Sequence, residues 1–236
     1  MREQVRRQGG SAIVFDADAV AEVGGHLFDP AHWQAQGAIT GSAAGRGAVH
    51  FIRAGDGEWV LRHYRRGGWA GRVVSDTYAW TGLAATRPFR EFRLTAQLRA
   101  LGLPVPSPVA ARVQRRGLAY RGDLITARIP RTETLADFLA REPLPLGEWH
   151  ALGALLRRFH EAGLRHDDIN ARNVLRDDAG GFHLIDLDKA RRVPGGAWQA
   201  RNLARFRRSL DKFLRQSAGF HFSAPDWEAL EAGYRR

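Results

Sequence analysis

Apolar positions follow two different periods along the chain, which predicts strands in its first part and helices in its second. Segments 48–52 and 59–64 are rich in β-branched and aromatic residues and flank a turn at 54–57, so we expect a hairpin there. Segments 109–113 and 123–129 also indicate strands, the second ended by Pro130. Between the hairpin and these two strands, apolar residues at helical spacing predict a helix from Pro88 to about Gly102.

After residue 130 the pattern becomes mainly helical. Thr134, with Asp137 three residues later, is typical of a helix N-cap, and apolar residues over 149–159 predict a helix that Gly163 ends. Segments 173–175 and 182–185 indicate a short hairpin, and another helix is expected from Trp198. The order predicts one α+β unit with a first lobe over 1–126, a hinge over 127–131 and a reduced, mainly helical second lobe over 132–236.

Composition limits the function classes. The 236 residues are 44% hydrophobic and include no cysteine, which excludes disulfides and thiolate metal sites. The polar start has no signal-peptide pattern, and no stretch reaches the ~20 apolar residues of a membrane span. We therefore expect a cytosolic protein, with binding to a membrane surface left open.

Basic charge is carried almost entirely by arginine. The net charge is +11, and Lys189 and Lys212 are the two lysines among 36 basic residues. Such a surplus of guanidinium groups favours a polyanionic partner, which could be anionic lipid, nucleic acid or a phosphorylated substrate.

A polar loop at His166–Asn173, followed by Leu184–Asp188, has the spacing used in phosphoryl transfer. Asp168 and Asn173 are five positions apart, and Asp186 follows thirteen later. In kinases such a loop places one carboxylate at the acceptor hydroxyl, while the amide and the second carboxylate hold magnesium. The sequence therefore predicts an ATP-dependent kinase with Asp168 as the catalytic residue and Asn173 and Asp186 as Mg²⁺ ligands.

The first part of the chain offers groups for the nucleotide. No lysine precedes Lys189, so Arg62, at the end of a predicted strand, is the candidate for the α- and β-phosphates, and Glu91 is its candidate partner on the following helix. Glycines before the hairpin could let backbone amides approach phosphate, and backbone groups in the hinge could contact adenine. The glycines are Gly41, Gly45 and Gly47, and the hinge residues are Ala127 and Ile129.

Two differences from protein kinases narrow the range of possible acceptor molecules. Asn170 stands where most protein kinases have a lysine, and no glycine follows Asp186 directly. Only 50 residues follow Asp186, which leaves little room for docking a peptide. A small hydroxyl compound or a glycolipid headgroup is the expected acceptor.

These motifs resemble the 3-deoxy-D-manno-oct-2-ulosonic acid (Kdo) kinases of Gram-negative bacteria. The resemblance rests on residues 59–68, 89–92, 104–106, 168–173 and 184–188. It implies a protein-kinase-like fold and transfer of the ATP γ-phosphate to the 4-hydroxyl of Kdo on a lipid A precursor (Kdo-lipid IVA). It also implies a peripheral location at the cytoplasmic face of the inner membrane, with Asp168 carried over as the active-site residue.

Several finer expectations accompany this hypothesis. Asp188 is expected to pair with Lys189, and its alternative role is to bind a second metal ion. Arg172, His63 and Tyr64 are guesses for Kdo contacts. A helix after Trp198 is expected to pack by one apolar face, which includes Leu214, and to present its basic residues to an anionic membrane. The alternatives are another small-molecule or compact serine kinase, such as an antibiotic phosphotransferase, or a basic nucleic-acid-binding domain.

Overall fold

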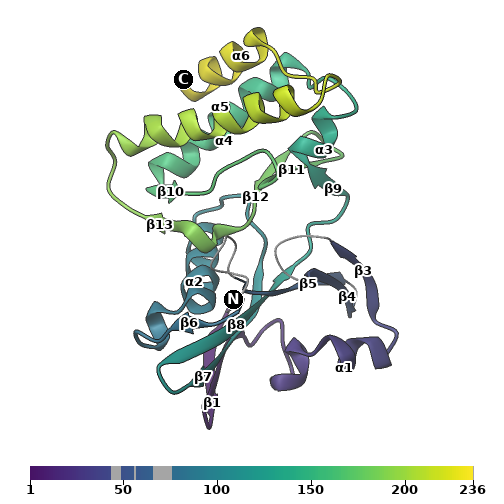
Figure 1. Ribbon diagram of the computed structural model, residues 1–236, viewed down its shortest axis with the longest axis vertical. Coiled ribbons are helices and arrows are strands. Elements are labelled where there is room, and N and C mark those ends of the chain that lie inside the picture. The colour runs from purple at the N-terminus through teal and green to yellow at the C-terminus, as the bar shows by residue number, and fades with distance from the viewer. Residues whose placement is uncertain (44–48, 56, 66–75, 236) are drawn as a thin grey trace. The chain divides into compact units, whose positions relative to one another are not determined.

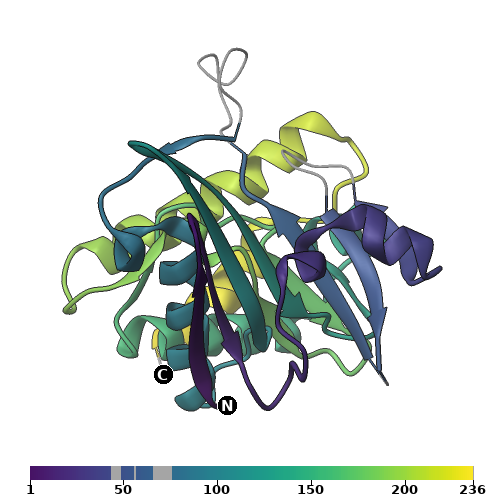
Figure 2. The ribbon, with the colours of Figure 1, turned by 90° about the horizontal axis from the view of Figure 1, so that it is seen from below.

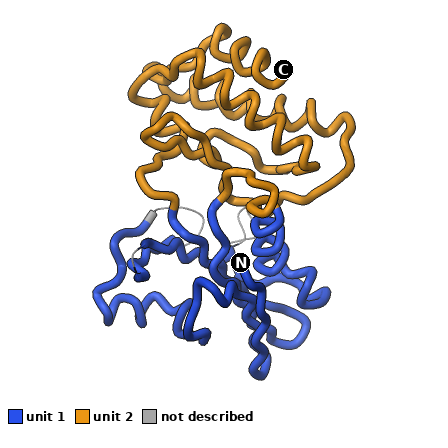
Figure 3. The backbone as a smooth tube through the Cα atoms, turned by 180° about the vertical axis from the view of Figure 1, so that it is seen from behind, with its two compact units in different colours: residues 1–97, 106–128 blue, residues 98–105, 129–236 orange. Residues whose placement is uncertain are grey.

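A computed structural model describes residues 1–43, 49–55, 57–65 and 76–235 (Figure 1). The chain divides into two compact units (Figure 3). Unit 1 comprises Met1–Gln97 and Pro106–Arg128, and unit 2 comprises Leu98–Val105 and Ile129–Arg236. The boundary after Arg128 falls within the range expected for the hinge, and residues 98–105 group with unit 2.

Unit 1 is built on an antiparallel sheet with the strand order β1-β2-β7-β8-β5-β4-β3, and a short strand, β6, also pairs with β8. In chain order the strands are β1 (Glu3–Gln8), β2 (Ser11–Asp16), β3 (Ile39–Ala43), β4 (Val49–Ala54), β5 (Gly57–His63), β6 (Tyr78–Ala79), β7 (Pro108–Arg116) and β8 (Ala119–Ala127).

Alternating side chains give this sheet two apolar faces. Ile13 and Phe15 of β2 belong to a core shared with η1 (Gly25–Phe28) and α1 (Pro30–Ala35). Val14, between them, belongs to a second core that includes Phe89 and Phe92 of α2 (Arg87–Ala100). A short 3-10 turn, η3 (Leu83–Ala85), precedes α2, and Figure 2 shows the sheet with its helices from below. Both faces of the sheet are thus covered, and the parity of a position decides which helix its side chain meets.

Unit 2 is mainly helical, with α3 (Leu135–Leu139), α4 (Leu146–Glu161), α5 (Trp198–Gln216) and α6 (Ala224–Arg235). Two small antiparallel sheets complete it. One has the order β12 (Phe182–Leu184), β11 (Val174–Asp177), β9 (Thr132–Thr134), and the other pairs β10 (Leu164–His166) with β13 (Ala190–Arg192), which follows the 3-10 turn η4 (Leu187–Lys189). A Cβ added at Gly153 would lie 1.9 Å from the Leu230 carbonyl oxygen, so α4 and α6 pack backbone against backbone.

The expected α+β architecture is confirmed, and so is the N-cap at Thr134, whose hydroxyl accepts from the Asp137 amide. Three details were wrong. The strand expected over 123–129 ends at Ala127. It begins earlier than expected, at Ala119, because Gly117 (φ 59°) turns the chain tightly from β7 into β8. β1 and β2 were not expected at all. Leu214 of α5 is 41% exposed rather than packed.

Candidate active site

The polar loop connects β10 to β11 in unit 2, and its own side chains fix its shape. The Asn170 side-chain amide donates to the Asp168 carbonyl at 2.7 Å, and the Asn173 amide donates to the same oxygen at 3.0 Å. The side-chain oxygen of Asn170 accepts from the Arg172 backbone N–H at 2.9 Å, which closes an Asx turn. Ile169 and Ala171 are buried beneath the loop. The backbone at Asp168 is therefore held from two sides.

The two candidate Mg²⁺ ligands lie at the same end of the hairpin β11–β12, as its expected register requires. Val174 pairs with Leu184, and the Ile185 N–H donates to the Asn173 carbonyl at 2.9 Å. Asp186 follows with φ 59° and ψ 59°, a left-handed conformation that costs a non-glycine residue about 1–3 kcal/mol. The chain thus leaves the strand sharply at the residue expected to bind metal.

His166 connects the loop to this strand end. Its Nδ1 accepts from the Asp168 backbone N–H at 3.3 Å, and its Nε2 lies 3.4 Å from the Ile185 carbonyl. A ring that accepts at Nδ1 and donates at Nε2 is the neutral tautomer. Burial lowers the pKa of His166, which agrees with this assignment.

Two cations face the Asp168 carboxylate. The Lys189 ammonium donates to Oδ2 at 2.9 Å, and Arg205 Nη1 of α5 lies 4.0 Å from Oδ1. Lys189 was expected to pair with Asp188, and its bond to Asp168 corrects that expectation. The signal that could have singled it out is its rarity as one of two lysines.

The neighbouring carboxylate, Asp167, is turned to other partners. It accepts from Arg165 Nε at 2.6 Å and from Arg191 Nη1 at 2.9 Å, on strands β10 and β13. Two guanidinium groups therefore balance its charge within the β10–β13 sheet, and it is a structural residue by its contacts.

Helix α5 contacts both ends of the loop. Asn202 donates to the His166 carbonyl at 2.7 Å, and the Ser209 hydroxyl accepts from the Ala171 N–H at 3.1 Å. Asn202 also bonds the buried His160 of α4 at 3.1 Å. Together with Arg205, these contacts show that one face of α5 serves the loop, which corrects the expectation that its basic residues all face outward. Sequence patterns gave no sign of the roles of Asn202 and Ser209.

In unit 1, Arg62 and Glu91 form the expected pair. Arg62 and Tyr64 share a parity on and after β5 that turns both side chains toward α2. Arg62 Nη2 and the Tyr64 hydroxyl donate to the two carboxylate oxygens of Glu91, which is 4% exposed. The Arg62 guanidinium also lies 5.0 Å from the centre of the Tyr64 ring. Arg62 is thus oriented by an acid and an aromatic ring.

The other residues suggested for nucleotide binding make local contacts that do not by themselves indicate a nucleotide site. Gly41 lies at a bulge in β3, where a Cβ would meet the Phe51 ring at 3.3 Å, while Gly45 and Gly47 lie outside the described residues. The Ala127 N–H donates to the Ser107 carbonyl at 2.8 Å, so its amide is already engaged within unit 1. The Ile129 carbonyl accepts from the Thr132 hydroxyl at 2.9 Å.

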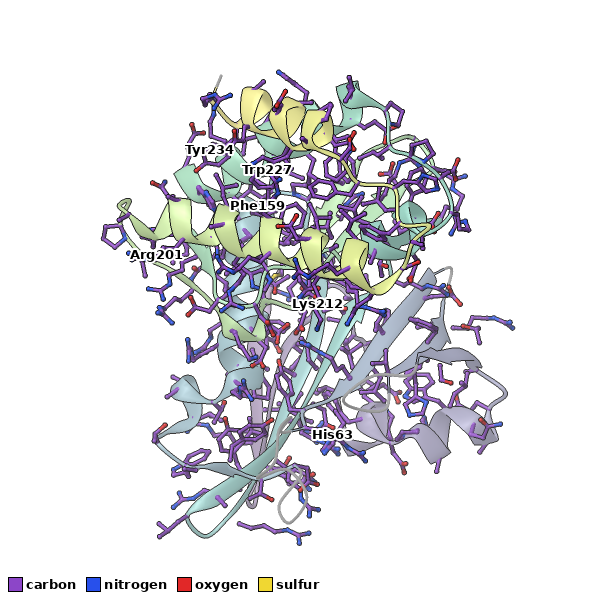
Figure 4. All side chains as sticks on the ribbon, turned by 45° about the horizontal axis from the view of Figure 1, so that its top comes forward. His63, Phe159, Arg201, Lys212, Trp227 and Tyr234 are labelled. Atoms are coloured by element: carbon purple, nitrogen blue, oxygen red, sulfur yellow. The ribbon has the colours of Figure 1, made fainter. Side chains whose placement is uncertain are left out.

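Of the three residues suggested for Kdo contacts, Tyr64 is buried, and His63 and Arg172 stay as candidates. Tyr64 is 4% exposed and bonded to Glu91, so its hydroxyl faces the interior of unit 1. His63 bonds the buried Asp123 at 2.7 Å, and this hydrogen bond raises its pKa (His63 is labelled in Figure 4). Arg172 is exposed, and its guanidinium lies 5.3 Å from the centre of the Phe213 ring.

Within the described ranges, no group of three or more His, Cys, Asp or Glu side chains is arranged to hold a metal ion. No helix in the described part of the chain has the length and apolarity to cross a membrane.

The loop, the following hairpin and the arginine–glutamate pair together define a kinase-like protein. The model of the lipopolysaccharide kinase (Kdo/WaaP) family matches residues 30–234, and the chain belongs to this family. It is 44% identical to a 3-deoxy-D-manno-octulosonic acid kinase of Stenotrophomonas maltophilia over 232 residues, covering 96% of this chain and 90% of the relative. The corresponding kinase of Photobacterium profundum is 41% identical over 222 residues, or 94% of both chains.

One solved structure, a kinase of Cydia pomonella granulovirus, matches 67% of this chain and 54% of its own with a TM-score of 0.45 and 16% identity. The family assignment confirms the resemblance seen in the sequence and supports phosphoryl transfer over the nucleic-acid-binding alternative.

Proposed function

We propose that this protein transfers the γ-phosphate of ATP to the 4-hydroxyl of Kdo on a lipid A precursor. Membership of the lipopolysaccharide kinase family and nearly full-length similarity to named Kdo kinases support this activity. The structural observation that carries it is the loop in which two amide side chains hold the backbone of Asp168.

Asp168 would accept or orient the proton of the acceptor hydroxyl. The hydroxyl oxygen bonds to the γ-phosphorus, the bond from that phosphorus to the bridging oxygen breaks, and ADP leaves with the electron pair. The Asp168 side chain is 32% exposed, so an acceptor hydroxyl can reach its carboxylate. General base catalysis of this kind contributes about 10²- to 10⁴-fold in rate.

The residues present fit a magnesium site. Asn173 donates through its side-chain nitrogen to the Asp168 carbonyl, so the oxygen is the atom that can bind a cation. Asp186 adds a carboxylate from the adjacent strand end, and Mg²⁺ prefers oxygen ligands from one or two side chains with the rest from water and phosphate. When bound, Mg²⁺ would neutralise charge on the phosphates.

Arg62 would bind the α- and β-phosphates in place of the usual lysine. Its permanent charge and planar fork suit phosphate, and the bond to Glu91 fixes its direction. The other groups proposed for the nucleotide are backbone atoms near Gly41, Gly45, Gly47, Ala127 and Ile129.

The protein would act as a peripheral protein at the cytoplasmic face of the inner membrane, where the acceptor lipid is anchored. Exposed basic residues of α5, including Arg201, Arg208, Lys212 and Arg215, support attraction to an anionic leaflet. Arg201 and Lys212 are labelled in Figure 4. Each is worth about 1 kcal/mol near such a surface, so Arg208→Gln with Lys212→Gln should weaken binding to anionic vesicles roughly 30-fold. Arg90→Gln with Arg116→Gln, an equal charge change in unit 1, is the control, and equal losses for both pairs would contradict α5 as the membrane-binding element.

The activity is tested by incubating the purified protein with labelled ATP, Mg²⁺ and one of two acceptors. The acceptors are the Kdo-bearing lipid A precursor and the same precursor without Kdo. We expect labelled lipid with the first acceptor and none with the second. Equal labelling of both, or of neither, would contradict the proposed function.

A further inference from the structure

Lys189 contacts the catalytic carboxylate from an element outside the catalytic loop. Its ammonium donates to Asp168 Oδ2 at 2.9 Å, and its side chain is 45% exposed. Its backbone is fixed to the same loop, because the Asp167 N–H donates to the Lys189 carbonyl at 3.2 Å and Ala190 pairs with His166. The ammonium group is thus held beside Asp168 by β13 while part of it remains open to a ligand.

This position matters because the loop itself has no lysine. Protein kinases usually carry one two residues after the catalytic aspartate, where this chain has Asn170. The Asn170 amide is used on the Asp168 carbonyl at 2.7 Å and carries no charge. If the reaction is phosphoryl transfer, charge developing beside Asp168 needs a cation from elsewhere.

Among the described residues, we compare three cations near the loop that could supply this positive charge, and their contacts differ. Arg172 is exposed and lies over the Phe213 ring. Arg205 is 4.0 Å from Asp168, beyond hydrogen-bond distance. Lys189 alone of the three makes a hydrogen bond to the carboxylate, and an ammonium has three donors, so one bond to Asp168 leaves the group able to bind phosphate oxygens as well.

We infer that the Lys189 ammonium binds the transferred phosphoryl group next to Asp168 and supplies from η4 and β13 the charge that a loop lysine supplies in protein kinases. The inference rests on the proposed function and adds a catalytic residue to it. Lys189 stays protonated throughout; the hydroxyl proton goes to Asp168, and ADP takes the electron pair of the broken bond.

Kinetics give the first test. Removing one donor from developing negative charge typically lowers kcat about 10²- to 10³-fold, so Lys189→Met should lose this much while the KM values for ATP and acceptor change less than about threefold. Lys189→Arg keeps the charge and should recover part of kcat. Arg116→Met, which removes an exposed cation at the end of β7 in unit 1, is the control and should retain wild-type kcat. A Lys189→Met enzyme that folds and keeps its kcat would overturn the inference.

Chemical labelling gives a second readout that needs no acceptor. An ATP analogue with an acyl group on its γ-phosphate acylates a nearby amine: nitrogen bonds to the acyl carbon, the phosphate leaves with the electron pair, and the amine proton passes to water. Lys189 and Lys212 are the two side-chain amines, so peptide mapping is unambiguous. Lys212 lies seven residues beyond Arg205 on α5, about 10 Å further along the axis.

We expect acylation at Lys189 that excess ATP prevents, and none at Lys212 that ATP prevents. ATP-protected labelling at Lys212 instead, or no protected labelling at Lys189, overturns the inference. Protected labelling at Lys189 in a protein that transfers no phosphate to Kdo would contradict the proposed acceptor and leave the role of Lys189 supported.

Discussion

The pair formed by Arg62 and Glu91 should be worth much more than a surface ion pair. Glu91 is 4% exposed and Arg62 is 24% exposed, so their bond is largely shielded from water. Hydrogen bonds to charged groups contribute about 1.5–3 kcal/mol, and breaking a buried pair from one side costs more because the other charge is left behind. Glu91→Gln keeps the shape of the side chain and removes its charge. We expect it to lower the free energy of unfolding by about 2 kcal/mol.

A double-mutant cycle isolates the interaction. Arg62→Met, Glu91→Gln and the double variant should give a coupling energy of about 1.5–3 kcal/mol. Arg93 and Glu3, which are 37% and 34% exposed in the same unit, provide the control pair, for which we expect about 0.2–1 kcal/mol. Urea unfolding read through hydrogen exchange of peptides from β5 and α2 reports on unit 1 itself. A coupling energy between Arg62 and Glu91 no larger than that of the control pair would show that burial does not strengthen this ion pair.

Two further predictions concern stability. Gly153→Ala should lower the free energy of unfolding by more than about 3 kcal/mol, because the added Cβ would lie 1.9 Å from a backbone carbonyl oxygen of α6. A Cβ at Gly147 in the same helix meets nothing within 4 Å, so Gly147→Ala should be neutral or stabilising. Thermal unfolding compares the two variants, and equal melting temperatures would contradict the close packing of α4 on α6. Burial lowers the pKa of His160 and His166 below the ordinary 6.5, so the unfolded chain binds more protons below that pH and stability should fall as the pH drops from 6.5. His63 opposes this, since its raised pKa adds stability that is present below 6.5 and lost as the pH rises through the raised value; His63→Gln should therefore make the acid loss steeper between pH 7.5 and 5.5, and a shallower slope would contradict the sign.

Local signals explain what could be predicted from the sequence. The Thr134 cap, the α4 periodicity and the turn at Gly163 (φ 78°) depend on neighbouring residues, and each is present in the structure. The expected placement of Asn173 and Asp186 at one end of the hairpin is also present, because the register of two paired strands fixes which residues share an end.

Contacts between distant segments were beyond the pattern. Lys189 meets Asp168 through the pairing of β10 with β13, and Asn202 of α5 bonds His166 of β10. Neither contact leaves a periodic pattern in the sequence. The strands β1 and β2 were missed although Ser11–Asp16 contains an apolar run after the turn at Gly9. Tyr64 was suggested as a Kdo contact, but it has the same strand parity as Arg62, and this parity turns its side chain toward Glu91 in the interior of unit 1.

Phosphate transfer should depend on Asp168, and the neighbouring Asp167 provides the control. Asp167 and Asp168 are adjacent side chains of equal exposure. Asp167 is held by two arginines at 2.6 and 2.9 Å, and Asp168 is held by Lys189 at 2.9 Å. The decisive measurement is the rate of phosphate transfer to the Kdo-bearing lipid A precursor by Asp168→Asn and Asp167→Asn enzymes of verified fold. We expect Asp168→Asn to lose about 10²- to 10⁴-fold and Asp167→Asn to stay within about threefold of wild type. Transfer by Asp168→Asn at more than about a tenth of the wild-type rate would contradict the account.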